Sequence, residues 1–213
     1  MKHILPIITL TTLAAAASAQ SAASSGFNYN TVSLGYSNED FSDSGVADAI
    51  SLTSVTLSQK IGKNLVGTLG LHNGAIAGQG QDLRGFSVGL GYIYSVNSSL
   101  DIIIGASLTD LQSASYDSQS VNFNDIGVKA RYNLGNGIEL TAGIGRNVYG
   151  NEESDSNDAS DENGAARNVY SLGAAYKLTA DLSVSASYAW SKGISGTTDA
   201  DSETWSVALV HSF

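Results

Sequence analysis

The sequence predicts an all-β protein, a transmembrane antiparallel up-and-down β-barrel with ten strands, or eight on the alternative count. From Gln20 onward, short segments of alternating apolar and polar residues follow one another without a helical period. Outside the N-terminus no run of about 18 or more apolar residues occurs, so a membrane-spanning form would have to cross with strands. The 23 glycines and the single proline fit a barrel, because proline removes hydrogen bonds from a sheet.

The N-terminus has the pattern of a secretory signal peptide. Lys2 and His3 precede the apolar run Ile4–Ala17, and small residues at Ala17 and Ala19 form a cleavage site before Gln20. We therefore expect a signal peptide at 1–19 and a barrel domain at 20–213. The expected mature chain has 9 basic and 20 acidic residues, a net charge of −11, which argues against nucleic acid as a partner. Without cysteine the chain forms no disulfides.

Alternation of side chains predicts the position of each strand. The strands are expected at 27–36, 49–60, 65–72, 83–95, 100–108, 121–132, 138–148, 168–178, 182–190 and 204–213. The second is ambiguous, because Ile50 and Leu52 have the opposite parity to Val55 and Leu57, and a bulge near Thr53 would reconcile them. Eight strands would result if the first or second segment were not a full crossing.

The last ten residues carry an alternating apolar stripe that ends on an aromatic residue. One face of this strand consists of Trp205, Val207, Leu209, His211 and Phe213. The stretch resembles the C-terminal strand of the bacterial outer-membrane β-barrel family, and the resemblance is to its small porin-like members. One residue departs from the family pattern, because His211 stands where an aromatic residue is usual. The resemblance implies an integral protein of the Gram-negative outer membrane and makes this stripe the assembly signal. It also implies partners: the barrel-assembly machinery and periplasmic chaperones, then outer-membrane lipid and lipopolysaccharide.

The connections between the expected strands alternate in length. Turns near residues 61, 97, 134 and 180 are short, whereas long polar connections fall at about 37–48, 73–82, 109–120, 149–167 and 191–202. Outer-membrane barrels place short turns in the periplasm and long loops outside, so both termini are expected in the periplasm. Outward aromatic residues gather towards both ends of the strands, as two interfacial girdles would require.

Charged residues on the inward faces are few and are expected near the short-turn end. These lumen charges are Lys60, Asp101, Asp125, Lys129, Arg131, Glu139 and Lys177. Pairing Tyr132 with Ile138 across the turn would set Arg131 directly opposite Glu139, which would stabilise the sheet. Such a pair acts as a plug or register pin, or alternatively as a charged constriction that selects small ions.

Most carboxylates fall in the long connections, where solvated, mutually repelling loops are the simplest interpretation. They number 16 of the 20: Glu39, Asp40, Asp43, Asp48, Asp82, Asp110, Asp117, Glu152, Glu153, Asp155, Asp158, Asp161, Glu162, Asp199, Asp201 and Glu203. The alternative is loose binding of divalent cations at the lipopolysaccharide surface. The stretch 155–159 departs from the calcium-loop pattern at Ala159, so no metal site and no cofactor are predicted.

The sequence favours a non-enzymatic barrel. Ten-stranded outer-membrane proteases need paired acids and a histidine with an aspartate at the outer rim, and His72 is the only histidine expected there. No catalytic residues are predicted. The expected function is porin-like, the passive passage of small solutes or ions through a narrow lumen. The alternative is a structural or surface-interaction barrel, adhesin-like, that acts through its acidic extracellular loops.

Overall fold

The structure is a computed structural model that describes residues 27–42, 49–77, 81–113, 120–149, 166–193 and 201–213. Its strands are β1 Thr31–Ser42, β2 Ala49–Ile61, β3 Leu65–Ile76, β4 Gln81–Asn97, β5 Leu100–Ser113, β6 Ser120–Gly135, β7 Ile138–Tyr149, β8 Ala166–Lys177, β9 Leu182–Gly193 and β10 Asp201–Ser212. Within these ranges no helix is long and apolar enough to cross a membrane. The expected signal peptide and its cleavage site lie outside the described residues.

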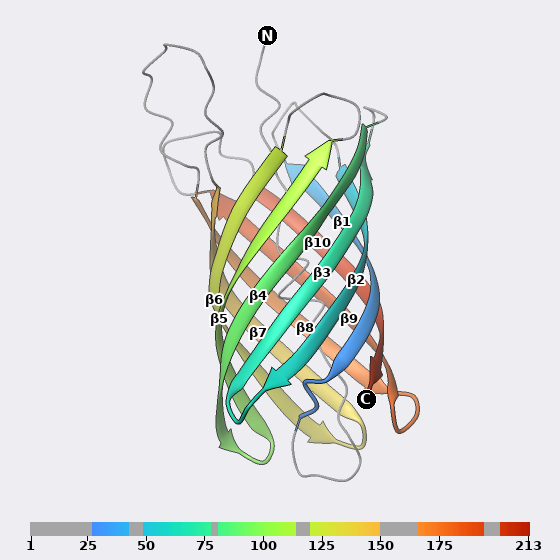
Figure 1. The fold of residues 1–213 in the computed structure, drawn as a ribbon, viewed down its shortest axis with the longest axis vertical. Coiled ribbons are helices and arrows are strands. Elements are labelled where there is room, and N and C mark those ends of the chain that lie inside the picture. Colours follow the sequence, from blue (N-terminus) through green and yellow to red (C-terminus); the bar gives the residue numbers. More distant parts are fainter. Residues whose placement is uncertain (1–26, 43–48, 78–80, 114–119, 150–165, 194–200) are drawn as a thin grey trace.

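The strands form one closed barrel in which each strand pairs with its neighbours in the sequence (Figure 1). The first and last strands also pair, antiparallel, over the whole of β1. This closure confirms the predicted ten-stranded up-and-down barrel and excludes the eight-stranded alternative. Both β1 and β2 are full members of the wall, with continuous pairing on each side.

The wall is apolar outside and mostly polar inside. On β4, for example, Phe86, Val88 and Leu90 are exposed, whereas Ser87 between them is buried. Across the barrel, the exposed large hydrophobic residues are outward-facing, and the buried inward positions are largely serine, threonine, glycine and alanine. A water-soluble domain reverses this order, so the arrangement is that of a barrel surrounded by lipid.

Several predicted strand ends are wrong. Strand β1 begins at Thr31 rather than at residue 27, because residues 27–30 leave the wall. At the long-connection end the strands reach further than predicted, for example to Ser113 in β5 and from Ala166 in β8. Polar residues can occupy a strand there, since the outward face of the wall need not be apolar beyond the apolar band. The long connections are correspondingly shorter than expected.

The predicted bulge near Thr53 is absent from the described wall. The pairing of β2 with β1 and β3 runs through Thr53 without a shift of register. Ile50 and Leu52 are therefore inward-facing, and both are buried. In the described wall, register shifts lie instead between Ser95 and Asn97 and between Asn133 and Gly135, next to short turns. Apolar residues can thus face the lumen at the long-connection end of the barrel. The alternation of side chains in the sequence did not by itself predict this.

Gly85 on β4 allows a close approach of the next strand. A Cβ atom added there would meet the carbonyl oxygen of Asp110 and would lie 2.6 Å from the Cδ2 atom of Leu111. We expect Gly85→Ala to lower the free energy of unfolding by about 1–3 kcal/mol through overpacking. Gly35→Ala is the control, since its nearest neighbour is the rotatable hydroxyl of Ser54 at 3.1 Å. Urea titrations in detergent should separate the two variants, and equal midpoints would contradict the overpacking.

Candidate functional site: the lumen

An ion pair lies inside the barrel near its short-turn end. Arg131 on β6 donates from Nε to Glu139 Oε1 at 2.7 Å and from Nη2 to Oε2 at 2.9 Å. Arg131 is completely buried and Glu139 nearly so. This two-pronged geometry is the strongest form of an arginine–carboxylate contact. The pair therefore fixes two side chains in the confined space between β6 and β7.

Two aromatic rings from the segment before β1 cover this arginine. The guanidinium carbon of Arg131 lies 4.7 Å from the ring centre of Phe27 and 4.5 Å from that of Tyr29. Tyr29 also packs in an apolar cluster with Val66 and Ile93 inside the barrel. Residues 27–30 thus turn into the lumen instead of lengthening β1, and aromatic rings over a desolvated cation are favourable contacts.

The tyrosine hydroxyl is held by β5, the strand next to β6, where Asp101 pairs in register with Arg131. Tyr29 donates a hydrogen bond of 2.6 Å to Asp101 Oδ2 on β5. Burial raises the pKa of the Tyr29 hydroxyl above its ordinary value, which keeps it a neutral donor to this carboxylate. We call Phe27, Tyr29, Asp101, Arg131 and Glu139 the mouth cluster. It joins the N-terminal segment to three strands of the wall.

The predicted register between β6 and β7 is wrong by two residues. Tyr132 pairs with Leu140 rather than with Ile138, and the residue opposite Arg131 is Thr141. Arg131 and Glu139 still meet because they are diagonal neighbours on the same face, and long side chains can span that separation. The cause of the shift is the irregularity between Asn133 and Gly135, which the even spacing assumed from the sequence did not include.

The other predicted lumen charges do not all lie together. Lys129, two positions before Arg131 on the same face, is buried. Lys60 has its ammonium nitrogen 5.9 Å from the ring centre of Tyr29, and Lys177 is half-buried beside the short turns. Asp125, in contrast, lies further along β6 towards the long connections and is separate from the mouth cluster.

Asp125 belongs to a second group of inward polar residues. In register it faces Asn147 on β7, and Asn147 faces Arg167 on β8. All three are buried, and Asp125 Oδ2 accepts a hydrogen bond of 3.1 Å from Ser107. We call these residues the lumen row. Sequence reasoning missed Asn147, because it is uncharged, and Arg167, because the strand was expected to begin one residue later.

Between the mouth cluster and the lumen row most inward side chains are small, with Lys129 on β6 as an exception. They include Gly105, Gly127, Gly143, Gly145, Ser171, Gly173, Ser185, Ser187, Ser54 and Ser206. A barrel whose interior is a packed core needs bulky branched residues at these positions. Few large side chains therefore project into the middle of the lumen, and the wall itself sets its width.

One carboxylate expected in an outer loop lies inside the barrel. Glu39 is in β1, is buried, and accepts a hydrogen bond of 2.7 Å from Ser202 Oγ. Asp40, Asp82 and Glu203 are exposed at the same end of the wall. Asp110 and Asp201 are likewise in strands, whereas the predicted loop acids at 43, 48, 117, 152–162 and 199 lie outside the described residues. Among the described residues no three His, Asp or Glu side chains are grouped as metal ligands.

His72 is buried in the lumen rather than placed on an open rim. Its Nε2 atom lies 3.0 Å from Ser87 Oγ on the adjacent strand. Its Nδ1 atom has no hydrogen-bond partner in the part of the chain that the structure describes. Among the described residues no carboxylate hydrogen-bonds to this imidazole, as the acid that orients a catalytic histidine does.

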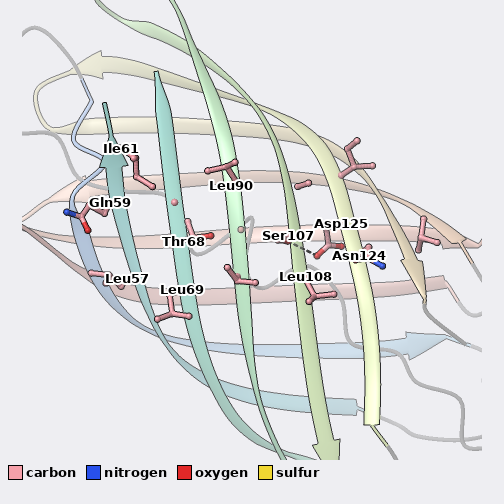
Figure 2. Close-up of a pocket in the computed structure, with 16 residues that line it drawn as sticks. Leu57, Gln59, Ile61, Thr68, Leu69, Leu90, Ser107, Leu108, Asn124 and Asp125 are labelled. Carbon is pink, nitrogen blue, oxygen red and sulfur yellow. Dashed lines mark hydrogen bonds between the residues drawn. The ribbon is translucent and has the colours of Figure 1, made fainter. Parts of the chain in front are cut away.

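A groove of about 740 Å³ lies in the barrel wall around β2 to β7. Figure 2 shows residues of both parities around it, with Leu57, Leu69, Leu90 and Leu108 from the outward face and Thr68, Ser107 and Asp125 from the inward face. Its lining is predominantly apolar, and it is separate from the mouth cluster. We interpret it as part of the lipid-facing surface.

The C-terminal stripe lies where the sequence predicted it, on the outward face of β10. Trp205, Val207, Leu209 and Phe213 are exposed, and the Phe213 backbone N–H donates to the Asn30 carbonyl at 3.0 Å. His211 pairs with Val32 on one side and Leu182 on the other. Within the folded barrel, Phe213 therefore contributes one backbone hydrogen bond and a ring directed to the surroundings.

Deleting Phe213 is expected to abolish assembly in cells while leaving refolding into detergent largely intact. The folded state loses a contact of about 1 kcal/mol, whereas the proposed assembly signal loses its final residue. The measurement is the gel mobility of unheated against boiled membrane extracts, with Phe213→Tyr as the control that keeps an aromatic end. Normal amounts of heat-modifiable protein in cells that express the deletion would refute the signal.

Comparisons with known proteins agree with this architecture. A family model described as outer membrane protein beta-barrel domain matches residues 8–213. No curated protein sequence matches the chain. Among solved structures, the KdgM porin in complex with disordered oligogalacturonate has a TM-score of 0.45 and 13% identity, over 86% of this chain and 99% of that one.

Two further structures have similar statistics. Ail, the attachment invasion locus protein of Yersinia pestis, has a TM-score of 0.40 and 15% identity, over 87% of this chain and 99% of that one. A loop-deletion mutant of OmpT, an outer membrane protein of Vibrio cholerae, has a TM-score of 0.38 and 14% identity, with 78% of this chain covered. The chain spans 54% of the length of that OmpT structure.

Proposed function

This chain belongs to the outer-membrane β-barrel family, and we propose that within it the protein is a porin-like barrel for small solutes or ions. It is an integral outer-membrane protein. The observation that carries the proposal is the lumen: small inward side chains occupy the middle of the barrel, between the mouth cluster and the lumen row. A space bounded by glycine and serine admits water more readily than a core of branched side chains does.

The mouth cluster and two lysines near it supply the selectivity in this proposal. Arg131, Lys129 and Lys60 bring positive charge to the short-turn end, and Asp101 and Glu139 bring negative charge. Rings of charged groups at a constriction favour ions of one sign, and the diameter of the constriction limits the size of the solutes that pass. The proposed substrates are therefore small, hydrated solutes rather than polymers.

Orientation and biogenesis complete the proposal. The short turns and both termini are periplasmic, as in barrels of this class, and the long connections face outwards. The exposed stripe of β10 supports recognition by the barrel-assembly machinery after delivery by periplasmic chaperones. The same outward apolar face supports contact with outer-membrane lipid and lipopolysaccharide.

A planar lipid bilayer tests the proposed passage directly. Purified folded barrel should produce discrete single-channel currents in potassium chloride, and heat-unfolded protein from the same preparation should not. A salt gradient across the bilayer then gives the sign of the preferred ion. If neither the parent nor a variant with an unblocked mouth conducts, the porin proposal is wrong.

The second candidate is a surface-interaction barrel, adhesin-like or structural. It is favoured by the exposed carboxylates at the long-connection end, among them Asp40, Asp82, Asp201 and Glu203. Divalent cations would bridge such carboxylates to lipopolysaccharide. Neither candidate function is enzymatic. The surroundings of His72 support this, because its side chain hydrogen-bonds to Ser87 and not to an acid.

A further inference from the structure

Two cationic side chains and an amide form a row on the outward face of the barrel. Arg146 on β7 and Lys192 on β9 are exposed and point outward, since the buried Asn147 and Ser191 beside them point into the lumen. Asn168 on β8 pairs with Arg146 on one side and with Lys192 on the other. Neighbouring strands are about 4.8 Å apart, so the two charged residues are roughly 10 Å apart at their backbones.

Outward cations are rare in this chain, which has 10 basic and 20 acidic residues. Of the described basic residues in the half of the wall near the long connections, Arg84, Arg146 and Lys192 face outward. Neither Arg146 nor Lys192 forms an ion pair within the part of the chain that the structure describes. Two such charges, on the two strands that flank β8, attract an anion from the surroundings.

The residues below the row indicate its depth in the membrane. Tyr170 and Trp190 pair in register two positions nearer the barrel centre, and their stacked rings have centroids 5.7 Å apart. Tyr188 extends the aromatic surface, with its ring centroid 5.9 Å from that of Trp190. Tyrosine and tryptophan rings prefer the boundary between acyl chains and headgroups. Arg146, Asn168 and Lys192 therefore lie at the level of the headgroups.

The neighbouring strands limit this surface on both sides. On the β6 side, the residue in register with Arg146 is the apolar Ile126. On the β10 side, the exposed Glu203 pairs in register with Trp190. An anionic ligand is thus confined to β7, β8 and β9, which are consecutive in the wall (Figure 1).

We propose that Arg146, Asn168 and Lys192 bind the phosphorylated headgroup of a membrane glycolipid. The two cations bind phosphate groups at either end of the headgroup, the Asn168 amide donates to an oxygen between them, and Tyr170 with Trp190 packs against the sugar and the first methylenes. Arg146 and Lys192 lie two strand spacings apart. This separation fits a headgroup with two phosphates better than a headgroup with one phosphate. The proposal rests on the orientation given above, which places this end of the barrel in the outer leaflet.

Native mass spectrometry of the folded barrel in detergent measures this binding without reference to conductance. The probe is a diphosphorylated, acylated glucosamine disaccharide, compared with its dephosphorylated form. The variant is R146Q/K192Q, and the matched control is R84Q, an exposed outward arginine on β4 whose register neighbours, Asn73 and Gln112, are uncharged. With about 1 kcal/mol for each cation near a phosphate, the double variant should bind roughly thirtyfold more weakly.

The expected pattern is weaker binding in R146Q/K192Q, unchanged binding in R84Q, and weak binding of the dephosphorylated probe by all three proteins. Equal losses in R84Q would show a general charge effect and overturn the site. Displacement of the lipid by an equal concentration of inorganic phosphate would show a site for free anions instead. If the double variant lacks the gel mobility of a folded barrel, the single variants R146Q and K192Q should each show about a fivefold loss, and unchanged binding in both would overturn the proposal.

Discussion

Replacing Glu139 with alanine is expected to destabilise the barrel by about 3–5 kcal/mol, because it leaves the guanidinium of Arg131 buried without its carboxylate. Arg131 is completely buried, and its Nε and Nη2 atoms both donate hydrogen bonds to Glu139. The rings of Phe27 and Tyr29 still cover the cation, but cation–π contacts are weaker than the lost ion pair. Denaturant titration of the parent and variant in the same detergent measures the difference.

A double-mutant cycle isolates the pair from other effects of substitution. Arg131→Met with Glu139→Leu removes both charges and keeps most of the volume, so the double variant should be much closer to the parent than Glu139→Ala is. Glu139→Gln is the milder control, since it keeps the shape and one acceptor. If the changes in the free energy of unfolding of the two single variants simply add in the double variant, the two side chains are not coupled.

Removing the two aromatic rings of the mouth cluster is expected to increase conductance several-fold. Phe27 and Tyr29 project from residues 27–30 into the short-turn end of the lumen, where Tyr29 is buried. The variant F27A/Y29A replaces both rings by methyl groups and removes the bond between Tyr29 and Asp101. Single-channel recordings of the parent and variant under the same salt conditions measure the change.

Outward aromatic residues provide the matched control for this variant. Y36A/F86A also removes two rings, but Tyr36 and Phe86 are exposed on the outer face of the wall, so its conductance should equal that of the parent. Tyr29→Phe keeps the ring and loses the hydroxyl, which separates blocking from hydrogen bonding. Parent-like currents in F27A/Y29A would show that this segment does not limit passage, and silence in every variant would favour the surface-interaction barrel.

The sequence predicted the fold through its strictest rule, the alternation of side chains in a strand. Each outward residue of β4 and β10 has the predicted orientation, because a shift by one position would expose every small polar residue to lipid. Strand ends were less predictable, because beyond the apolar band both faces can be polar. Ser113 and Ala166 therefore lie in strands although their composition suggested loops.

The lumen was predicted in part, and the reason is geometric. Residues on one strand face are known from parity, which indicated Arg131, Glu139 and Asp101 as inward charges. Contacts across the lumen depend on the register between strands and on segments outside the wall. The alternation of side chains gives no information on either. The inward turn of Phe27 and Tyr29 had no sequence signal, because both residues also fit the alternation of a strand.

The pairing of β1 with β10 means that the first part of the barrel wall cannot be completed until the last part has been made. The hydrogen bond between Ser202 and Glu39 joins residues 163 positions apart, and the pairing continues to the end of the chain. Until then β1 and the most recently formed strand are open edges that can pair with other chains. A chain that is cut short anywhere after β1 retains two such edges, so truncated products should aggregate or be degraded rather than persist as smaller barrels.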